Sequence, residues 1–228
     1  MRGWRLAWVL MLAWGLKAAG DAGTDQFNFA EGLFIQGDHQ SALEEFQTYA
    51  AKFPKGDHAP AAAYRIAECQ FRLEQFAKAA PAFESALKRY PKADNAPLGA
   101  YNLGRSWSRL EKPKQAADAF RLAAATGKGQ VREESLIGAG EALIGTDDFA
   151  AAAEVYEKLL AEFPKTTHRA AVLFSLGWVR TKLERYEPAI EAFSQLSREF
   201  PDYPDRAKAQ LAMSDCYTAL KQFDKSAL

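Results

Sequence analysis

The sequence predicts an all-α fold, an α-solenoid of antiparallel helix pairs with about six repeats, the last of them incomplete. The first observation is a small residue that returns every 36 or 37 residues, at Ala42, Ala79, Ala116, Ala152, Ala189 and Ser226. The second is an aromatic ring four positions after each of the first five, at Phe46, Phe83, Phe120, Tyr156 and Phe193. Two coupled periods of this length indicate one supersecondary unit copied along the chain, each copy burying its apolar face on the next.

The first 22 residues have the parts of a secretory signal peptide. Arg2 and Arg5 precede an apolar run over residues 6–16, and small residues follow at 18–20, 22 and 23. Eleven helical residues span about 16 Å, roughly half of a bilayer core, so a stable membrane span is not expected. We expect cleavage near residues 20–22 and export to the periplasm or cell envelope; an uncleaved anchor and an ordinary buried helix are the alternatives. The first cysteine is Cys69, so no lipid-bearing cysteine is expected near the cleavage region.

The rest of the chain, residues 25–228, is expected to form the repeat domain. In the fifth copy, apolar residues from Val172 to Leu183 follow the helical period, a turn comes next, and a second helix begins near Tyr186. Phe200-Pro201 ends that helix, because proline donates no hydrogen bond and disfavours helical geometry before it. The expected repeats lie near 25–54, 57–91, 95–127, 131–164, 167–201 and 205–228. The expected helices are 25–36 with 39–53, 57–73 with 76–90, 95–110 with 113–126, 131–145 with 148–163, 167–183 with 186–200, and 205–220 with a partner from 223.

Local signals support these boundaries. Gly37-Asp38 and Thr146-Asp147-Asp148 are turn and cap candidates, and Pro113 suits the first position of a helix. In the third copy Gly127 and Gly129 can end the helix where the proline is missing.

Two residues inside the predicted helices raise specific expectations. Pro81 predicts a kink or a late helix start. Gly177, in the middle of a helix, costs about 1 kcal/mol relative to alanine, which predicts a close contact with another helix.

The combined pattern resembles the tetratricopeptide repeat (TPR) family over residues 26–228. It has a small residue at relative position 8, alanine at 20, an aromatic residue at 24 and proline at 32. The residues at position 8 are Ala30, Ala67, Gly104, Gly140, Gly177 and Ser214. The spacing of 37 residues and the Phe-Pro or Tyr-Pro endings are similar to a bacterial envelope subgroup, the BamD-type outer-membrane assembly proteins and the YbgF-type periplasmic proteins associated with Tol–Pal.

The resemblance implies that relative positions 5, 9 and 13 of the first helices line a concave binding face. The residues singled out there are Tyr64, Tyr101, Phe174, Trp178, Arg72, Arg105 and Arg109. Tyrosine, tryptophan and arginine dominate binding hot spots, so the aromatic residues would form a peptide groove, with Trp178 and Tyr101 the best candidates for exposed rings. The alternative is that these rings only pack against the next repeat. The arginines would hold a partner's carboxylates, or else form a solvated, salt-bridged face.

Several function classes lack support in the sequence. The 29 basic and 29 acidic residues cancel, so no nucleic-acid partner is expected. His39, His58 and His168 are too dispersed for a metal or catalytic site and suit polar positions at helix starts. No cofactor motif or enzyme chemistry is expected. Cys69 and Cys216, four repeats apart, are expected to be buried small residues with no disulfide between them.

The sequence therefore predicts a non-enzymatic protein–protein interaction scaffold of the bacterial cell envelope. It would bind partner peptides or helices of envelope or outer-membrane components on its concave face, in outer-membrane assembly or a Tol–Pal-type role. The alternative is an N-terminal regulatory or targeting module of a longer secreted or membrane-associated protein whose active part lies beyond residue 228. Leu228 falls within the first turns of a helix that runs about four turns in earlier copies, which favours a fragment of a longer array.

Overall fold

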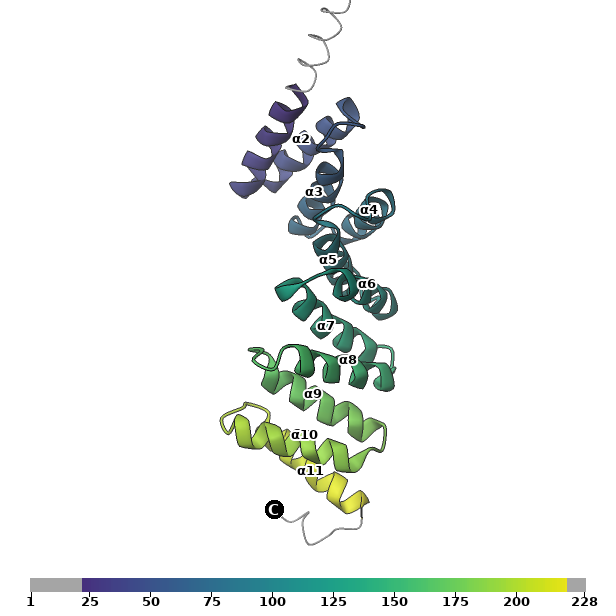
Figure 1. Cartoon of the computed structure of the whole chain (residues 1–228), viewed down its shortest axis with the longest axis vertical. Helices are drawn as coiled ribbons and strands as arrows, with labels where there is room; N and C mark the ends of the chain where they lie inside the picture. The colour runs from purple at the N-terminus through teal and green to yellow at the C-terminus, as the bar shows by residue number, and fades with distance from the viewer. Residues whose placement is uncertain (1–21, 221–228) are drawn as a thin grey trace, which may run out of the picture. The chain divides into compact units, whose positions relative to one another are not determined.

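The computed structural model describes residues 22–220, and this part of the chain is all helical, as predicted (Figure 1). It contains a first helix over residues 22–35, followed by α2 (His39–Lys52), α3 (Ala59–Arg72), α4 (Phe76–Arg89), α5 (Ala96–Arg109), α6 (Pro113–Thr126), α7 (Gly129–Ile144), α8 (Phe149–Glu162), α9 (Arg169–Lys182), α10 (Tyr186–Glu199) and α11 (Arg206–Ala219). The expected signal peptide up to residue 21 and the expected helix from residue 223 lie outside the described residues. No helix within 22–220 combines the length and the apolarity that a bilayer span requires.

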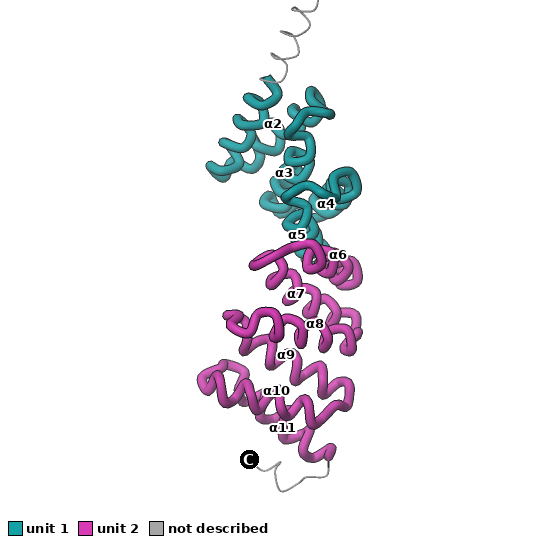
Figure 2. The backbone as a smooth tube through the Cα atoms, viewed as in Figure 1, with its two compact units in different colours: residues 1–110 teal, residues 111–228 magenta. Residues whose placement is uncertain are grey.

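The chain forms two compact units, residues 1–110 and 111–228 (Figure 2). In the first, α2 packs on α3, α3 on α4 and α4 on α5, and α3 also contacts α5. In the second, each helix from α6 to α11 packs on the next, and α9 also contacts α11. Contacts between neighbours and between every second helix are the packing of stacked helix pairs.

The repeat-defining residues form the core of each unit. The five alanines of the short period are buried, and so are the five rings that follow them: Ala42, Phe46, Ala79, Phe83, Ala116, Phe120, Ala152, Tyr156, Ala189 and Phe193. The predicted close contact at Gly177 is confirmed, because a Cβ atom there would lie 2.6 Å from the Phe193 ring. A Cβ atom on Gly140 would likewise overlap the Tyr156 ring.

The turn within each helix pair repeats one backbone conformation that the sequence analysis missed. One residue per turn is left-handed: Gly37 (φ 86°), Glu74 (57°), Glu111 (56°), Asp147 (57°) and Glu184 (57°). In the turns at Gly37, Glu74, Asp147 and Glu184, the next residue donates its N–H to a carbonyl five positions back, as in Arg185 to Arg180 at 2.9 Å, which satisfies the end of the first helix. Only one of these five positions is glycine, so the other turns carry local strain.

The caps expected at Asp38 and Asp148 are confirmed, whereas Thr146 and Asp147 belong to the turn. The carboxylates of Asp38 and Asp148 accept hydrogen bonds from the N–H groups of Ser41 (3.1 Å) and Ala151 (3.2 Å). Pro113 opens α6.

Several helix starts differ from the expectation by one to three residues, and one of the two alternatives at Pro81 is excluded. Helix α7 begins at Gly129 rather than at residue 131, directly after Lys128 in extended geometry. The predicted late start at Pro81 is not found, because α4 begins at Phe76 and continues through this proline. Burial of the helix on both sides of Pro81, at Ala79, Ala80 and Phe83, outweighs the loss of one backbone hydrogen bond.

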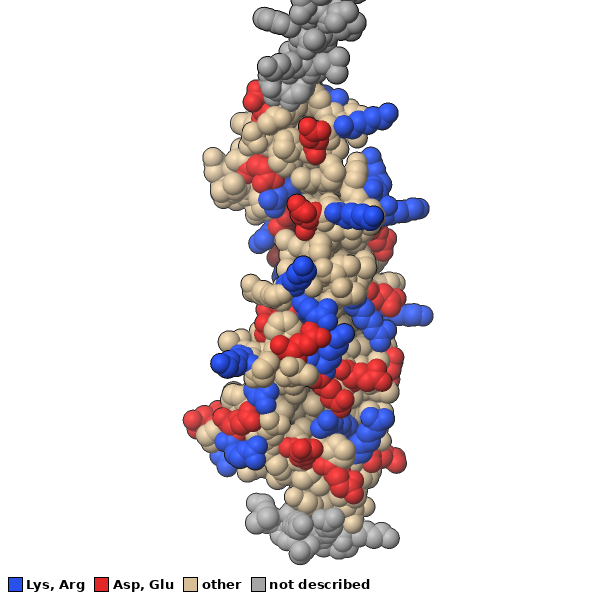
Figure 3. Space-filling model, viewed as in Figure 1, with Lys and Arg blue, Asp and Glu red and all other residues tan. Residues whose placement is uncertain are grey.

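Charged side chains of both signs are interspersed over the face seen in Figure 3. This mixture matches the equal number of basic and acidic residues in the sequence. A distribution of this kind creates local charge pairs rather than a broad field of one sign.

Candidate functional site

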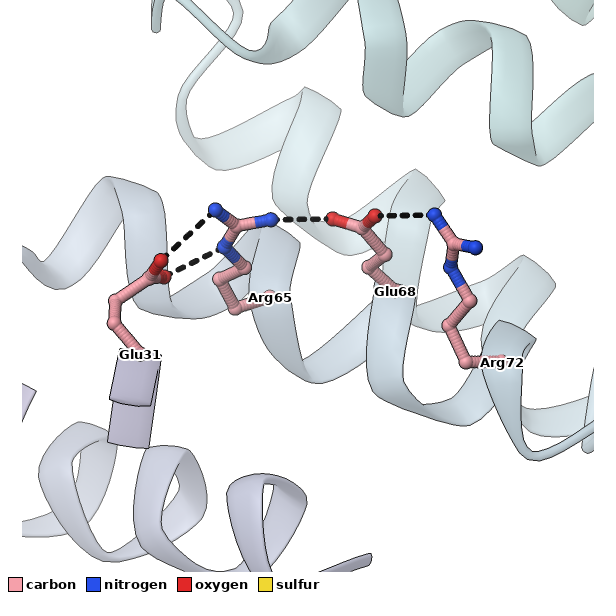
Figure 4. A network of polar contacts seen from close by, with 4 residues as sticks. All are labelled: Glu31, Arg65, Glu68 and Arg72. Atoms are coloured by element: carbon pink, nitrogen blue, oxygen red, sulfur yellow. Dashed lines mark hydrogen bonds and ion pairs between the residues drawn. The ribbon is translucent and has the colours of Figure 1, made fainter. Parts of the chain in front are cut away.

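The candidate site lies in the first unit, on the first helix and on α3 and α5. Its base is a chain of ion pairs across two repeats (Figure 4). Arg65 of α3 binds Glu31 of the first helix with two hydrogen bonds, from Nε at 2.6 Å and from Nη2 at 2.9 Å. Its Nη1 donates to Glu68 at 2.8 Å, and the other oxygen of Glu68 receives a longer contact from Arg72 at 3.4 Å.

Arg65 is fixed by this network. Its guanidinium also lies 4.4 Å from the centre of the Phe34 ring. Burial opposes its charged form, but hydrogen bonds and the charges of Glu31 and Glu68 outweigh burial and raise the pKa of Arg65. Both acidic residues therefore have their carboxylates committed to arginines of the same chain.

The three predicted arginines lie near the end of α3 and the start of α4, where Arg72 is the last residue of α3. Arg105 of α5 reaches over Phe71, the neighbour of Arg72, at 4.7 Å from the ring centre. One helical turn further on, Arg109 lies 5.9 Å from the centre of Phe76, the first residue of α4. The salt-bridged alternative applies only to Arg72, since Arg105 and Arg109 make no ion pair within residues 22–220.

The aromatic candidates of the first unit have different environments. Tyr64 is only 2% exposed, and its hydroxyl donates to the carbonyl of Tyr90 at 3.0 Å. Burial raises its pKa to about 12. Tyr64 is thus held mainly by packing and leaves almost no side-chain surface for a partner. Tyr101 is half-buried, and the guanidinium of Arg105 lies 5.6 Å from the centre of its ring.

The aromatic candidates of the second unit are half-buried rather than fully exposed. Phe174 lies between Phe193 and Tyr203, with ring centres 6.1 and 6.0 Å away. Trp178 meets Phe149 edge to face at 5.5 Å, and Lys182 Nζ lies 5.2 Å from the tryptophan ring centre. Packing therefore covers part of the surface of each ring, in line with the packing alternative.

The comparisons with known proteins agree with this architecture. A family model described as an outer membrane lipoprotein, YfiO, matches residues 23–227. The chain belongs to the YfiO family. No curated protein matches the sequence.

Solved structures are similar to this YfiO-family chain at low identity, which shows the fold alone, and two of them are described as TPR proteins. A TPR protein from Parabacteroides merdae superimposes with a TM-score of 0.64 at 16% identity, covering 91% of this chain and 77% of that one. YrrB, described as a TPR protein with an unusual peptide-binding site, gives 0.67 at 21% identity over 81% and 90% of the two chains. PilF of Pseudomonas aeruginosa gives 0.57 at 16% identity over 93% and 89%.

The second unit of this YfiO-family chain contains a repeated ion pair that the sequence analysis missed. Arg132 at the start of α7 binds Glu162 at the end of α8 at 2.6 Å, and Arg169 binds Glu199 in the same way in the next repeat at 2.7 Å. In both pairs the arginine hydrogen bond lowers the pKa of the glutamate. Arg132 and Arg169 are 37 residues apart, and so are Glu162 and Glu199, so the repeat spacing could have revealed both pairs.

The histidines and cysteines considered in the sequence occupy helix starts or buried packing positions. His58 and His168 occupy the N-caps of α3 and α9, as predicted, and His58 stacks on Phe27 at 4.4 Å. Cys69 and Cys216 are free and buried, and burial raises the pKa of Cys69 to about 12, far from a reactive thiol. Within residues 22–220, no group of histidine, cysteine and acidic side chains is arranged to hold a metal ion.

Proposed function

We propose that this chain is a non-enzymatic scaffold of the bacterial cell envelope that binds segments of other proteins on the face that the first helices of the pairs form within each unit. That face carries the residue types that dominate binding hot spots. In the first unit these are Arg72, Arg105, Arg109 and Tyr101, and in the second unit Phe174 and Trp178. The single observation that carries the proposal is the pair Arg105 and Arg109, which lie over aromatic rings and have no acidic partner among residues 22–220.

Membership of the YfiO family supports a role at the outer membrane, and the expected signal peptide supports export. The sequence pattern resembles proteins with two envelope roles, which are outer-membrane assembly and Tol–Pal-type coordination. The description of YrrB as having a peptide-binding site supports a peptide or a helix as the bound element.

The test is a pull-down from envelope extract with the wild-type chain and a Tyr101→Ala/Trp178→Ala variant. Both rings are half-buried, so melting temperatures are measured first to establish that the variant is folded. Leu122→Ala is the control, because this leucine of α6 is 45% exposed and lies outside the proposed face. We expect at least one specific partner to be lost with the double variant and kept with the control. Equal recovery of every partner by all three chains would contradict the proposal.

A further inference from the structure

We infer that the partner segment is acidic, and that Arg72, Arg105 and Arg109 bind its aspartate or glutamate carboxylates. This inference rests on the proposed function and specifies the chemistry of the partner. The three arginines are called the arginine cluster below. They gather at one place, around the end of α3 and the C-terminal half of α5.

The chain's own carboxylates leave the arginine cluster with unused donors. Both oxygens of Glu31 accept from Arg65, and Glu68 is shared between Arg65 and Arg72. Arg72 has a side chain that is 55% exposed and makes one contact to Glu68, at 3.4 Å. The carboxylates of Glu31 and Glu68 are therefore used by Arg65 and Arg72, and neither pairs with Arg105 or Arg109.

Stacking prepares Arg105 and Arg109 for binding. A guanidinium over an aromatic ring keeps its N–H edges free, and its planar fork matches the two oxygens of a carboxylate. Since the rings of Phe71 and Phe76 are part of the helix packing, the arginines are partly ordered before a partner arrives. This ordering lowers the entropy cost of binding.

The charge distribution favours a short protein segment over a membrane or a nucleic acid. Binding to anionic lipid or to a phosphate backbone depends on many basic residues acting together. This chain has equal numbers of basic and acidic residues, and both signs are mixed over the face drawn in Figure 3. A local cluster of three arginines suits a few carboxylates on one segment.

The experiment is selection from a library of random 12-residue peptides displayed on phage, using the purified chain as bait. Three variants are compared with the wild type: Arg72→Gln/Arg105→Gln/Arg109→Gln; Arg105→Lys/Arg109→Lys; and a control, Arg121→Gln/Arg185→Gln/Arg198→Gln. The control removes the same charge from three other exposed arginines. Melting temperatures establish that all four chains are folded.

We expect the wild type and the control to enrich peptides rich in aspartate and glutamate, and the first variant to lose this enrichment. For the most enriched acidic peptide, fluorescence anisotropy should show about three- to fivefold weaker binding for each arginine removed, and about 30- to 100-fold for all three. The lysine variant should bind with intermediate affinity, because lysine keeps the charge but not the planar fork. Binding should weaken with added salt.

Other outcomes would overturn the inference. Absence of acidic enrichment, or equal enrichment with the first variant, would contradict it. Binding to vesicles of anionic phospholipid that the first variant loses would assign the arginine cluster to a membrane instead. If peptides without acidic residues bind and the pull-down still depends on Tyr101 and Trp178, the proposed function stands and only the partner chemistry is wrong. If neither assay recovers a partner, both fail.

Discussion

The close contact between Gly177 and the Phe193 ring decides whether alanine at position 177 stabilises or destabilises the chain. Alanine in place of glycine inside an exposed helix stabilises a protein by about 1 kcal/mol. At Gly177 the added methyl group would lie 2.6 Å from the Phe193 ring, and such overpacking costs about 1–3 kcal/mol. Ala30 and Ala67 are buried at the corresponding place in the first two copies, so the fold can hold a methyl group there. We therefore expect a cost near the middle of the range, and a net loss of about 1 kcal/mol for Gly177→Ala.

The matched control is Gly32→Ala, in the first helix. An added Cβ atom on Gly32 meets nothing within 4 Å, so the helix preference acts unopposed and the variant should gain about 1 kcal/mol. The two variants should thus differ by about 2 kcal/mol, or roughly 4–8 °C in melting temperature for a chain of this size. Thermal and urea unfolding followed by circular dichroism measure both.

A second substitution tests the cause of the loss. In a Phe193→Leu background the ring is gone, and Gly177→Ala should become neutral or stabilising, a coupling of about 1–2 kcal/mol. If Gly177→Ala stabilises the wild type as much as Gly32→Ala does, the close approach of this helix pair is refuted.

Three further predictions concern the turns, the repeated ion pairs and the buried tyrosine. Glu184→Gly should stabilise the chain by about 0.5 kcal/mol, because relief of left-handed strain (about 1–2 kcal/mol) exceeds the entropy cost of glycine (about 0.5–1 kcal/mol); clear destabilisation in thermal melts would contradict the assigned turn. Because folding lowers the pKa of Glu162 and Glu199, their stabilisation is full above the ordinary glutamate pKa and disappears as the pH falls through the lower folded value. The free energy of unfolding, measured by urea titration from neutral to acidic pH, should therefore fall less for Glu162→Gln/Glu199→Gln than for the wild type. The difference should be under about 1 kcal/mol per pair, and an unchanged acid sensitivity would argue against the pairs. Tyr64→Phe should cost about 0.5–1.5 kcal/mol of stability through its lost hydrogen bond, with unchanged partner recovery in the pull-down; loss of a partner from the folded variant would return Tyr64 to the binding face.

The repeated features of the fold were predictable, because the same residue type at the same spacing experiences the same packing. The buried alanines and rings, the cap at Asp148 and the close approach at Gly177 all follow from this rule. The left-handed turns were missed because glycine marks only the first of them. The acidic residues Glu74 and Glu184 do not by themselves indicate that conformation.

The candidate site was less predictable because residues at equivalent positions have different neighbours. Tyr64 and Tyr101 share a place in the repeat, yet Tyr64 is buried because Gly99 on α5 leaves room for its ring. The arginine cluster was visible as a pattern, but the choice of Glu31 as the partner of Arg65 depends on side-chain geometry.

The most direct test of the proposed binding face is photo-crosslinking in living cells. A photoreactive phenylalanine analogue replaces Tyr101 in one strain and Leu122 in another, and crosslinked products are identified by mass spectrometry. We predict that position 101 crosslinks to an envelope protein through an acidic segment and that position 122 does not. Equal products at both positions, or no crosslinked protein at position 101, would contradict a binding role for this face.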